Sequence, residues 1–245
     1  MPEGPTLIML KEEVQALQLE GKKLIDLTGY AELDKKKFIN KKVVEFRTWG
    51  KHFLICFNDS TIMVHLMLFG SYLINERKKT NVKLGLKFND AEINFYVVNV
   101  KVYDEPADEV YDWSGDIMSD EWDSAKALKK VKEKPQELLS DLLADQHIFS
   151  GSGNIIKNEA LFRAKLHPLN KAGDVPDKKL KELITKVRRF SFEFLKAKKS
   201  DTLDKHFKVY GKKECPDCKG ELKKEHLGKS RRRTYYCEKC QILYK

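Results

Sequence analysis

Apolar residues in the first hundred positions occur in short runs separated by polar turns, which is the pattern of β-strands. The runs are four to six residues long and rich in β-branched and aromatic side chains. Asn58-Asp59 and Asn89-Asp90 separate neighbouring runs and have the composition of hairpin turns. So many short strands predict a β-sandwich or barrel. The expected strands cover residues 24–27, 43–46, 53–57, 61–66, 71–74, 83–88 and 92–97.

Helical spacing of apolar residues marks the beginning of the chain and its second half. Thr6 is a favourable N-cap, and the apolar positions after it recur every three or four residues as far as Gly21. The segment from Asp104 to Asp123 is acidic, contains proline and glycine, and lacks periodicity, which indicates a linker. Helical spacing then resumes. The later helices are expected over residues 122–134, 135–144 and 157–165, and from 175–177 onward.

A glycine turn separates two of the later helical runs. Its sequence is Gly151-Ser152-Gly153-Asn154, and glycine permits a sharp turn and the close approach of another backbone. The turn leads into a helix, whose free N–H groups and dipole attract an anion, and Asn154 adds an amide donor. On these residues alone, a phosphate-binding turn and a plain connection between helices are equally weighted.

Charge favours a polyanionic partner. Lys and Arg outnumber Asp and Glu 47 to 37, and the formal net charge is +10. Such a balance is typical of nucleic-acid binding, although many basic proteins bind no specific partner. No apolar run approaches the roughly 18 residues of a membrane span, and the N-terminus lacks the pattern of a signal peptide. We expect a nucleic acid, and no membrane, as the partner.

Four of the five cysteines lie near the end of the chain with the spacing of a metal site. Cys215-x-x-Cys218 and Cys237-x-x-Cys240 are separated by 18 residues, within the range of a four-cysteine zinc site. Four thiolates complete a tetrahedron, so the expected cofactor is one structural Zn²⁺; two disulfides are the alternative. The basic and aromatic segment 229–236 between the pairs reads as a phosphate-contacting finger, with solvated charge as the alternative.

The first residues allow amine chemistry. The residue after Met1 is small, so we expect an aminopeptidase to remove Met1 and leave Pro2 at the N-terminus. A terminal amine is less basic than lysine, and although proline's secondary amine is intrinsically more basic, it can attack a sugar carbon and form an iminium. Glu3 could then shuttle protons. The simpler interpretation is a capped helix with a proline-rich start.

Two connections in the β-rich region also carry candidate chemistry. Trp49-Gly50-Lys51-His52 places a lysine on a glycine turn that enters a strand. Met67-Leu68-Phe69-Gly70 is expected to be an apolar tip between two strands. Core packing is the commoner role for such a tip, and a wedge inserted into a base stack is the functional alternative. Cys56 is expected to be a small core residue.

The motifs together resemble the formamidopyrimidine-DNA glycosylase and endonuclease VIII family of base-excision repair enzymes. The Pro-Glu-Gly-Pro opening is closer to the endonuclease VIII branch. The resemblance spans nearly the whole chain. It rests on Met-Pro-Glu-Gly-Pro at the start, Gly50-Lys51, Asp145-Gln146, Gly151-x-Gly-Asn154, Glu159-Ala-Leu-Phe, His167-Pro168, Val209-Tyr210-Gly211 and Arg232-Arg-Thr-Tyr-Tyr-Cys-x-x-Cys-Gln241.

The resemblance implies a role for each matching residue. Pro2 would attack C1′ of the damaged nucleotide, and Glu3 would be the acid/base that helps to open the sugar ring. Lys51 would lie near the lesion, and Arg232 would bind the phosphates flanking it. Asn154 would grip phosphate in a helix–two-turn–helix. The DNA-binding set is completed by Gly151, Gly153, Tyr210 and the void-filling side chains Met67, Leu68 and Phe69.

The implied protein is an α+β multidomain enzyme that excises oxidised bases and cuts the strand by β- and δ-elimination. The expected parts are a β-sandwich catalytic domain with an N-terminal helix (1–108), a linker (109–123), a helix–two-turn–helix domain (124–205) and a zinc finger (206–245). Its partner would be double-stranded DNA with oxidised bases or abasic sites, bound by a monomer. The location would be cytoplasmic, at the nucleoid, in a bacterium and nuclear in a eukaryote.

Some positions depart from the family pattern. Ser152 replaces an aliphatic residue, and the run from Gly211 to Cys215 is about one residue short. The segment between Phe194 and Phe207 is too short for the loop that covers an oxidised purine in one branch. We therefore expect a preference for oxidised pyrimidines and ring-opened or hydantoin lesions. The alternatives are a non-catalytic damaged-DNA-binding protein on the same scaffold and a zinc-ribbon DNA-binding protein.

Overall fold

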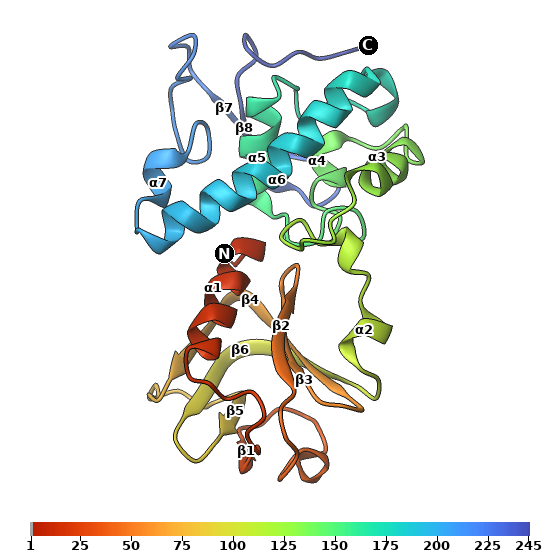
Figure 1. Cartoon of the computed structure of the whole chain (residues 1–245). Helices are drawn as coiled ribbons and strands as arrows, with labels where there is room; N and C mark the ends of the chain where they lie inside the picture. The colour runs from red at the N-terminus through yellow and green to blue at the C-terminus, as the bar shows by residue number, and fades with distance from the viewer. Residues whose placement is uncertain (1) are drawn as a thin grey trace. The chain divides into compact units, whose positions relative to one another are not determined.

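In the computed structural model, which describes residues 2–245, the strands of the first hundred residues form one antiparallel sheet (Figure 1). The strand order is β1-β5-β6-β4-β3-β2. The hairpin turns at Asn58-Asp59 and Asn89-Asp90 are confirmed, since they connect β3 to β4 and β5 to β6. The strands are β1 (Asp26–Thr28), β2 (Glu45–Trp49), β3 (His52–Cys56), β4 (Thr61–Ile74), β5 (Leu84–Lys87) and β6 (Glu92–Tyr103).

Residues 61–66 and 71–74 are not two strands, as the sequence analysis expected, but the two ends of β4. Residues 61–66 pair with β3 on one side and with the second half of β6 on the other. Residues 71–74 pair with the first half of β6, and this half of β6 also pairs with β5. The pairing of β4 with β6 is interrupted between Leu66 and Ser71. The expected sandwich is therefore one continuous sheet with two halves joined at this irregularity.

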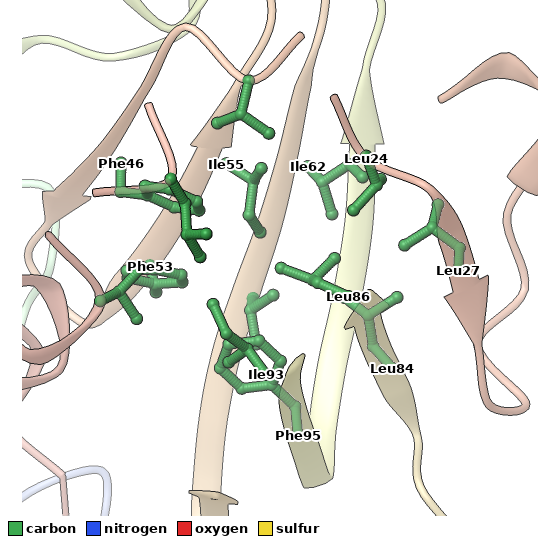
Figure 2. Packing of buried hydrophobic residues seen from close by; sticks show 14 of the residues in the cluster. Leu24, Leu27, Phe46, Phe53, Ile55, Ile62, Leu84, Leu86, Ile93 and Phe95 are labelled. Carbon is green, nitrogen blue, oxygen red and sulfur yellow. The ribbon is translucent and has the colours of Figure 1, made fainter. Parts of the chain in front are cut away.

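Both halves of the sheet contribute to a single hydrophobic core (Figure 2). Phe53 of β3 lies between Phe46 of β2 and Phe95 of β6, with ring centroids 5.8 Å apart in each pair. Helix α1 (Gly4–Gln15) packs against β2 and β3 and adds Leu7 and Leu10 to the same core. Burial of such side chains stabilises by about 1.5–3 kcal/mol each, so α1 is firmly held against the sheet.

The chain divides into two units between Asp112 and Trp113. Helix α2 (Ala107–Val110) belongs to the first unit. Residues 113–123, part of the expected linker, pack in the second unit, where Ile117 is fully buried and its N–H donates to the carbonyl of Ser150. Short 3₁₀ turns cover Lys35–Lys37, Trp113–Gly115 and Ala172–Asp174.

The second unit combines helices with a two-stranded hairpin. The helical segments expected over residues 122–134 and 157–165 and from 175–177 onward are present, but the helix expected over 135–144 is reduced to the four residues of α4 (Leu139–Leu142). Strand β7 pairs with β8 in an antiparallel ribbon. The finer division into domains at residue 206 stays a prediction. None of the helices in the described chain is long and apolar enough to cross a membrane. The elements are α3 (Ser124–Lys132), α4 (Leu139–Leu142), α5 (Asn154–Arg163), α6 (Asp177–Lys199), α7 (Leu203–His206), β7 (Lys223–Leu227) and β8 (Arg232–Tyr236).

Candidate catalytic and nucleic-acid-binding site

Pro2 directly precedes a buried carboxylate at the beginning of α1. Glu3 is the N-cap residue and is fully buried. Its side chain accepts the backbone N–H of Thr6, and the Thr6 hydroxyl lies 3.4 Å from the Glu3 backbone nitrogen that donates to it, which completes a capping box. Thr6 is therefore the third helical residue and not the expected N-cap. The helix begins earlier because Pro5 lacks an N–H and suits a first turn.

Lys51 lies on a two-residue turn between β2 and β3. Trp49 and His52 form the last pair of the ladder, and Gly50 has φ 56°, a left-handed conformation that favours glycine. Burial lowers the pKa of His52 to about 4, with further contributions from His65 and Lys51. The pKa of His65 is lowered by burial and then by Lys51. The lysine turn thus lies close to two imidazole rings, and both rings stay neutral at pH 7.

The base of the lysine turn is braced by the last residues of the first unit. The indole N–H of Trp49 donates to the carbonyl of Asp112 at 2.9 Å. The Tyr111 hydroxyl lies 3.3 Å from Nδ1 of His52, and the Trp49 and Tyr111 ring centroids are 5.2 Å apart. These contacts fix the position from which Lys51 projects.

Met67, Leu68 and Phe69 are exposed, so the core-packing interpretation of this apolar segment is wrong. Their exposed fractions are 45%, 57% and 79%. The segment is also not a tip between two strands. It bulges out of the middle of β4, because Leu66 pairs with Val98 and Ser71 pairs with Tyr96.

The chain holds this bulge in a constrained conformation. Only Val97 of β6 faces the four residues of the bulge, and it has φ 53°, which is unusual for a β-branched residue. A Cβ at Gly70 would lie 2.8 Å from the backbone nitrogen of Met67, so a larger residue would force the backbone of the bulge to shift. The constrained backbone of the bulge thus holds these apolar side chains in solvent.

The turn that precedes α5 is ordered by Gln146. Its side-chain oxygen accepts the N–H of Gly151 at 3.1 Å, and its side-chain nitrogen donates to the carbonyl of Ser152 at 2.9 Å. Gly151 has φ 96°, and Gly153 is the N-cap of α5. The predicted sequence of glycine turn followed by helix is confirmed. Ser152 is fully buried.

Asn154, the first residue of α5, contacts the hairpin near the end of the chain. It is 5% exposed, and its side-chain nitrogen donates to the carbonyl of Arg233 at 2.9 Å. Asn158, one turn later, accepts the N–H of Tyr235 at 2.7 Å. Four residues along a helix advance about 6.0 Å, and two residues along a strand advance about 6.8 Å. The two asparagines therefore satisfy successive groups on the edge of β8 that β7 leaves open.

The segment around Tyr210 is held by a buried carboxylate of α5. Glu159 is fully buried and accepts the backbone N–H groups of Lys208, Val209 and Tyr210 at 2.9–3.0 Å. The Tyr210 ring packs against Tyr235 of β8, with centroids 5.4 Å apart. The glycine turn, Tyr210 and the hairpin that carries Arg232 are thus all fixed to one helix.

The four cysteines expected to bind metal converge. Their sulfur atoms all lie within 4.8 Å of one another, with Cys215 to Cys240 at 3.8 Å and Cys218 to Cys237 at 3.5 Å. A tetrahedron with metal–sulfur bonds of about 2.3 Å has edges of about 3.8 Å, so the thiol set fits a metal ion. All five cysteines of the described chain are free thiols, which rules out the alternative of two disulfides.

Family models match both units of the chain. Residues 1–98 match the formamidopyrimidine-DNA glycosylase N-terminal domain, and residues 115–205 match the formamidopyrimidine-DNA glycosylase H2TH domain. The fold is that of the Lactococcus lactis formamidopyrimidine-DNA glycosylase bound to abasic-site DNA. The TM-score is 0.84 over 98% of this chain and 99% of that one, at 20% identity.

Curated relatives extend the comparison. Endonuclease 8-like 3 from Xenopus laevis is 34% identical over 207 residues, which are 79% of this chain and 34% of that protein. The formamidopyrimidine-DNA glycosylase of Lactobacillus helveticus is 26% identical over 86% of this chain and 87% of its own length. The chain spans about a third of the length of the endonuclease 8-like 3 proteins that it matches.

The chain belongs to the formamidopyrimidine-DNA glycosylase/endonuclease VIII family of DNA-repair glycosylases, in its endonuclease VIII-like branch.

Some buried polar residues of the site have no individual role predicted from the sequence, although Gln146 and Glu159 belong to its motifs. Lys157 and Asn158 face the hairpin, and Gln146 and Glu159 bind backbone groups. The available signal was weak: Asn158 follows Asn154 by one helical turn, and polar residues interrupt the apolar face of α5. The partners of Lys157, Asn158 and Glu159 are distant in sequence, so only the fold reveals them. Gln146 binds groups only five and six positions later in the chain.

Proposed function

We propose that this protein is a bifunctional DNA glycosylase and abasic-site lyase that removes oxidised bases through an iminium on Pro2. The observation that carries the proposal is the position of Pro2 immediately before buried Glu3 at the N-terminus of α1. Once Met1 is removed, the nucleophilic amine and a carboxyl group occupy adjacent residues. The helix end, with its free N–H groups, stabilises negative charge on that carboxyl group between proton transfers.

The chemistry of excision follows from these two groups. The Pro2 nitrogen attacks C1′ of the damaged nucleotide, the bond from C1′ to the base breaks, and the base leaves with the proton that the amine loses. Glu3 delivers a proton to the ring oxygen as the sugar opens, which leaves C1′ joined to Pro2 as an iminium. Lys51, on its braced turn, supplies positive charge beside the reacting sugar.

Strand cleavage follows from the same intermediate. The iminium acidifies C2′, so loss of a C2′ proton expels the 3′ phosphate, and a second elimination expels the 5′ phosphate. Water then releases the sugar remnant and regenerates the amine. Each step conserves electrons, and no redox cofactor is needed.

The remaining candidate residues serve recognition. The exposed bulge Met67–Phe69 fills the space left when the damaged base is flipped out. Asn154, Tyr210 and Arg232 and the turn at Gly151 and Gly153 contact the DNA backbone. With about six phosphates neutralised, the log–log salt dependence of duplex binding should have a slope near −5. The partner is DNA that contains oxidised bases or abasic sites, and the protein acts as a monomer.

The metal is proposed to be one structural Zn²⁺ held by Cys215, Cys218, Cys237 and Cys240. Four sulfur ligands at tetrahedral spacing leave no open coordination position. When bound, the ion supplies folding energy to the hairpin and takes no part in bond cleavage.

Oxidised pyrimidines and ring-opened or hydantoin lesions are the preferred substrates in this proposal. Only the short helix α7 lies between the end of α6 at Lys199 and the loop before Val209, so no long loop covers a purine there. A cleavage assay on a panel of lesions tests the preference. Strong excision of 8-oxoguanine opposite cytosine, with none of thymine glycol, would reverse it.

A Glu3→Gln variant tests the division of labour between the two residues. An abasic site has already lost its base, and its sugar equilibrates with the open aldehyde, so Pro2 can form the iminium there without an acid. We expect base excision to fall by about 10²–10⁴-fold while much of the cleavage at a preformed abasic site remains. Wild-type protein that binds damaged DNA but cleaves neither substrate would instead support the alternative, a non-catalytic damage-binding protein.

A further inference from the structure

The polar contact between α5 and β8 includes a buried lysine. Lys157 is 2% exposed, and its Nζ lies 2.9 Å from the hydroxyl oxygen of Thr234. Thr234 is fully buried and donates its own hydroxyl hydrogen to the carbonyl of Arg232 at 3.1 Å. The ammonium is therefore linked to the backbone of Arg232 through one hydroxyl group.

We propose that Lys157 is a positioning residue that holds Arg232 for the phosphate flanking the lesion. The inference rests on the proposed function, in which Arg232 contacts that phosphate. Lys157 acts through Thr234 and does not itself touch DNA.

The direction of these hydrogen bonds is fixed by the chemistry of the three groups. An ammonium can only donate, and a carbonyl can only accept. The hydroxyl of Thr234 must therefore accept from Lys157 and donate to Arg232. A methionine at position 157 fills a similar volume but leaves the hydroxyl without its donor, so the orientation of the hydroxyl is no longer set.

Lys157 and the two asparagines restrain different parts of β8. Asn154 and Asn158 bind the carbonyl of Arg233 and the N–H of Tyr235 along the open edge of the strand. Those edge contacts fix the register of the strand. Side chains alternate along a strand, so Thr234 and Arg232 project from the same face. The bond from Lys157 to Thr234 adds the restraint on that face.

The buried position of the Lys157 ammonium lowers the stability of the fold. Burial of an ammonium carries a desolvation penalty even when it is hydrogen-bonded. Lys157 is also the fourth residue of α5, where the positive end of the helix dipole disfavours a cation. A purely structural role would be met by an apolar residue. A buried cation beside Arg232 is useful where an anion must bind.

A double-mutant cycle on the zinc-loaded chain of residues 2–245 tests the inference. The probe is a duplex with a tetrahydrofuran abasic-site analogue, which is bound but not cleaved. We expect Lys157→Met to raise the Kd about tenfold and to reduce the magnitude of the salt slope by about one. Arg232→Ala should do the same, and the double variant should lose no more than Arg232→Ala alone. Lys178→Met, which removes an exposed charge at the start of α6, is the control for net charge.

Each outcome decides the inference. Additive losses, or an unchanged salt slope with only a lower melting temperature, would show that Lys157 merely stabilises the fold. If Lys157→Met does not fold, Thr234→Val breaks the same connection and must give the same non-additivity with Arg232→Ala. If Arg232→Ala loses binding while Lys157→Met and Thr234→Val lose none, the inference about Lys157 is overturned and the proposed function stands. Wild-type protein that does not bind the analogue would overturn the proposed function as well.

Discussion

Oε1 of Glu159 accepts the backbone N–H of Tyr210 at 3.0 Å, and the same oxygen accepts the N–H of Val209 at 2.9 Å. One buried carboxylate thus organises a backbone segment fifty residues away in the chain. The segment has no other regular structure to satisfy its N–H groups, so the carboxylate determines its shape.

Glu159→Gln should therefore destabilise the second unit. The amide keeps the size of the side chain but replaces an acceptor with a donor that faces backbone N–H groups. We expect the free energy of unfolding to fall by about 1–3 kcal/mol, the range for a buried group left without its partner. Urea denaturation monitored by tryptophan fluorescence measures the loss. Glu182→Gln, a partly exposed position on α6, should change stability little; equal losses in the two variants would refute the assigned role.

The exposed bulge of β4 predicts a separation of base excision from lyase activity. Leu68→Ala removes a side chain that is 57% exposed, so stability should change little. Excision of a damaged base from a duplex should fall by about tenfold, because the space left by the flipped base is no longer filled. Cleavage at a preformed abasic site should fall less. A single-turnover comparison of both substrates provides the measurement.

A matched variant tests whether the shape of the bulge matters as well as its side chains. Gly70→Ala places a methyl group 2.8 Å from the Met67 nitrogen and 3.0 Å from the Val97 carbonyl oxygen. We expect a loss of excision similar to that of Leu68→Ala together with a lower melting temperature. Normal excision by Gly70→Ala would show that the bulge does not have to be preformed.

The lowered pKa of His52 predicts that the stability of the first unit falls in acid. Burial lowers its pKa to about 4 in the folded chain, against about 6.5 in the unfolded chain. The neutral ring therefore contributes stability in full above pH 6.5, and this contribution is lost as the pH falls from 6.5 towards 4, because the unfolded chain binds the proton first. The slope from this one group is at most about 1.4 kcal/mol per pH unit.

His52→Gln should flatten this part of the stability profile. Urea midpoints between pH 7 and pH 4.5 should fall less steeply in the variant than in the wild type. His206→Gln, at an exposed position, is the control and should follow the wild type. Parallel profiles for wild type and His52→Gln would mean that the acid sensitivity originates elsewhere.

Removal of the metal should weaken DNA binding by the second unit and leave the first unit folded. Cys237→Ala deletes one of four converging thiols, so the hairpin that carries Arg232 should lose its order. We expect DNA affinity to fall by at least tenfold, with the far-ultraviolet signal of the first unit's sheet retained. Metal analysis of the wild type should give one zinc per chain. Unchanged DNA affinity in a metal-free sample would contradict the role of the finger.

The predictions from local pattern were accurate where the signal was local. The turns at Asn58-Asp59 and Asn89-Asp90 and the converging cysteines follow from composition and spacing alone. A local error is the start of α1: threonine is a preferred N-cap and glutamate is not, whereas here Glu3 is the N-cap and Thr6 is the third helical residue of the reciprocal cap.

Features that depend on distant contacts could not be predicted in the same way. Residues 67–70 read as a turn, because a four-residue excursion inside one strand is visible only from the pairing of β4 with β6. The bond from Lys157 to Thr234 joins residues 77 positions apart. A lysine in a helix is ordinarily expected to face solvent, and only tertiary packing shows that this one is buried.

The most direct test of the central claim is to identify the amine that attacks the sugar. Borohydride reduces an iminium to a stable amine, so treatment of wild-type protein with lesion DNA should give a covalent complex. After proteolysis and nuclease digestion, mass spectrometry should find the sugar remnant on the peptide that begins with Pro2, and protein acetylated at Pro2 should give no complex. A complex that persists after acetylation, with the remnant on Lys51, would contradict the assignment of Pro2 as the nucleophile.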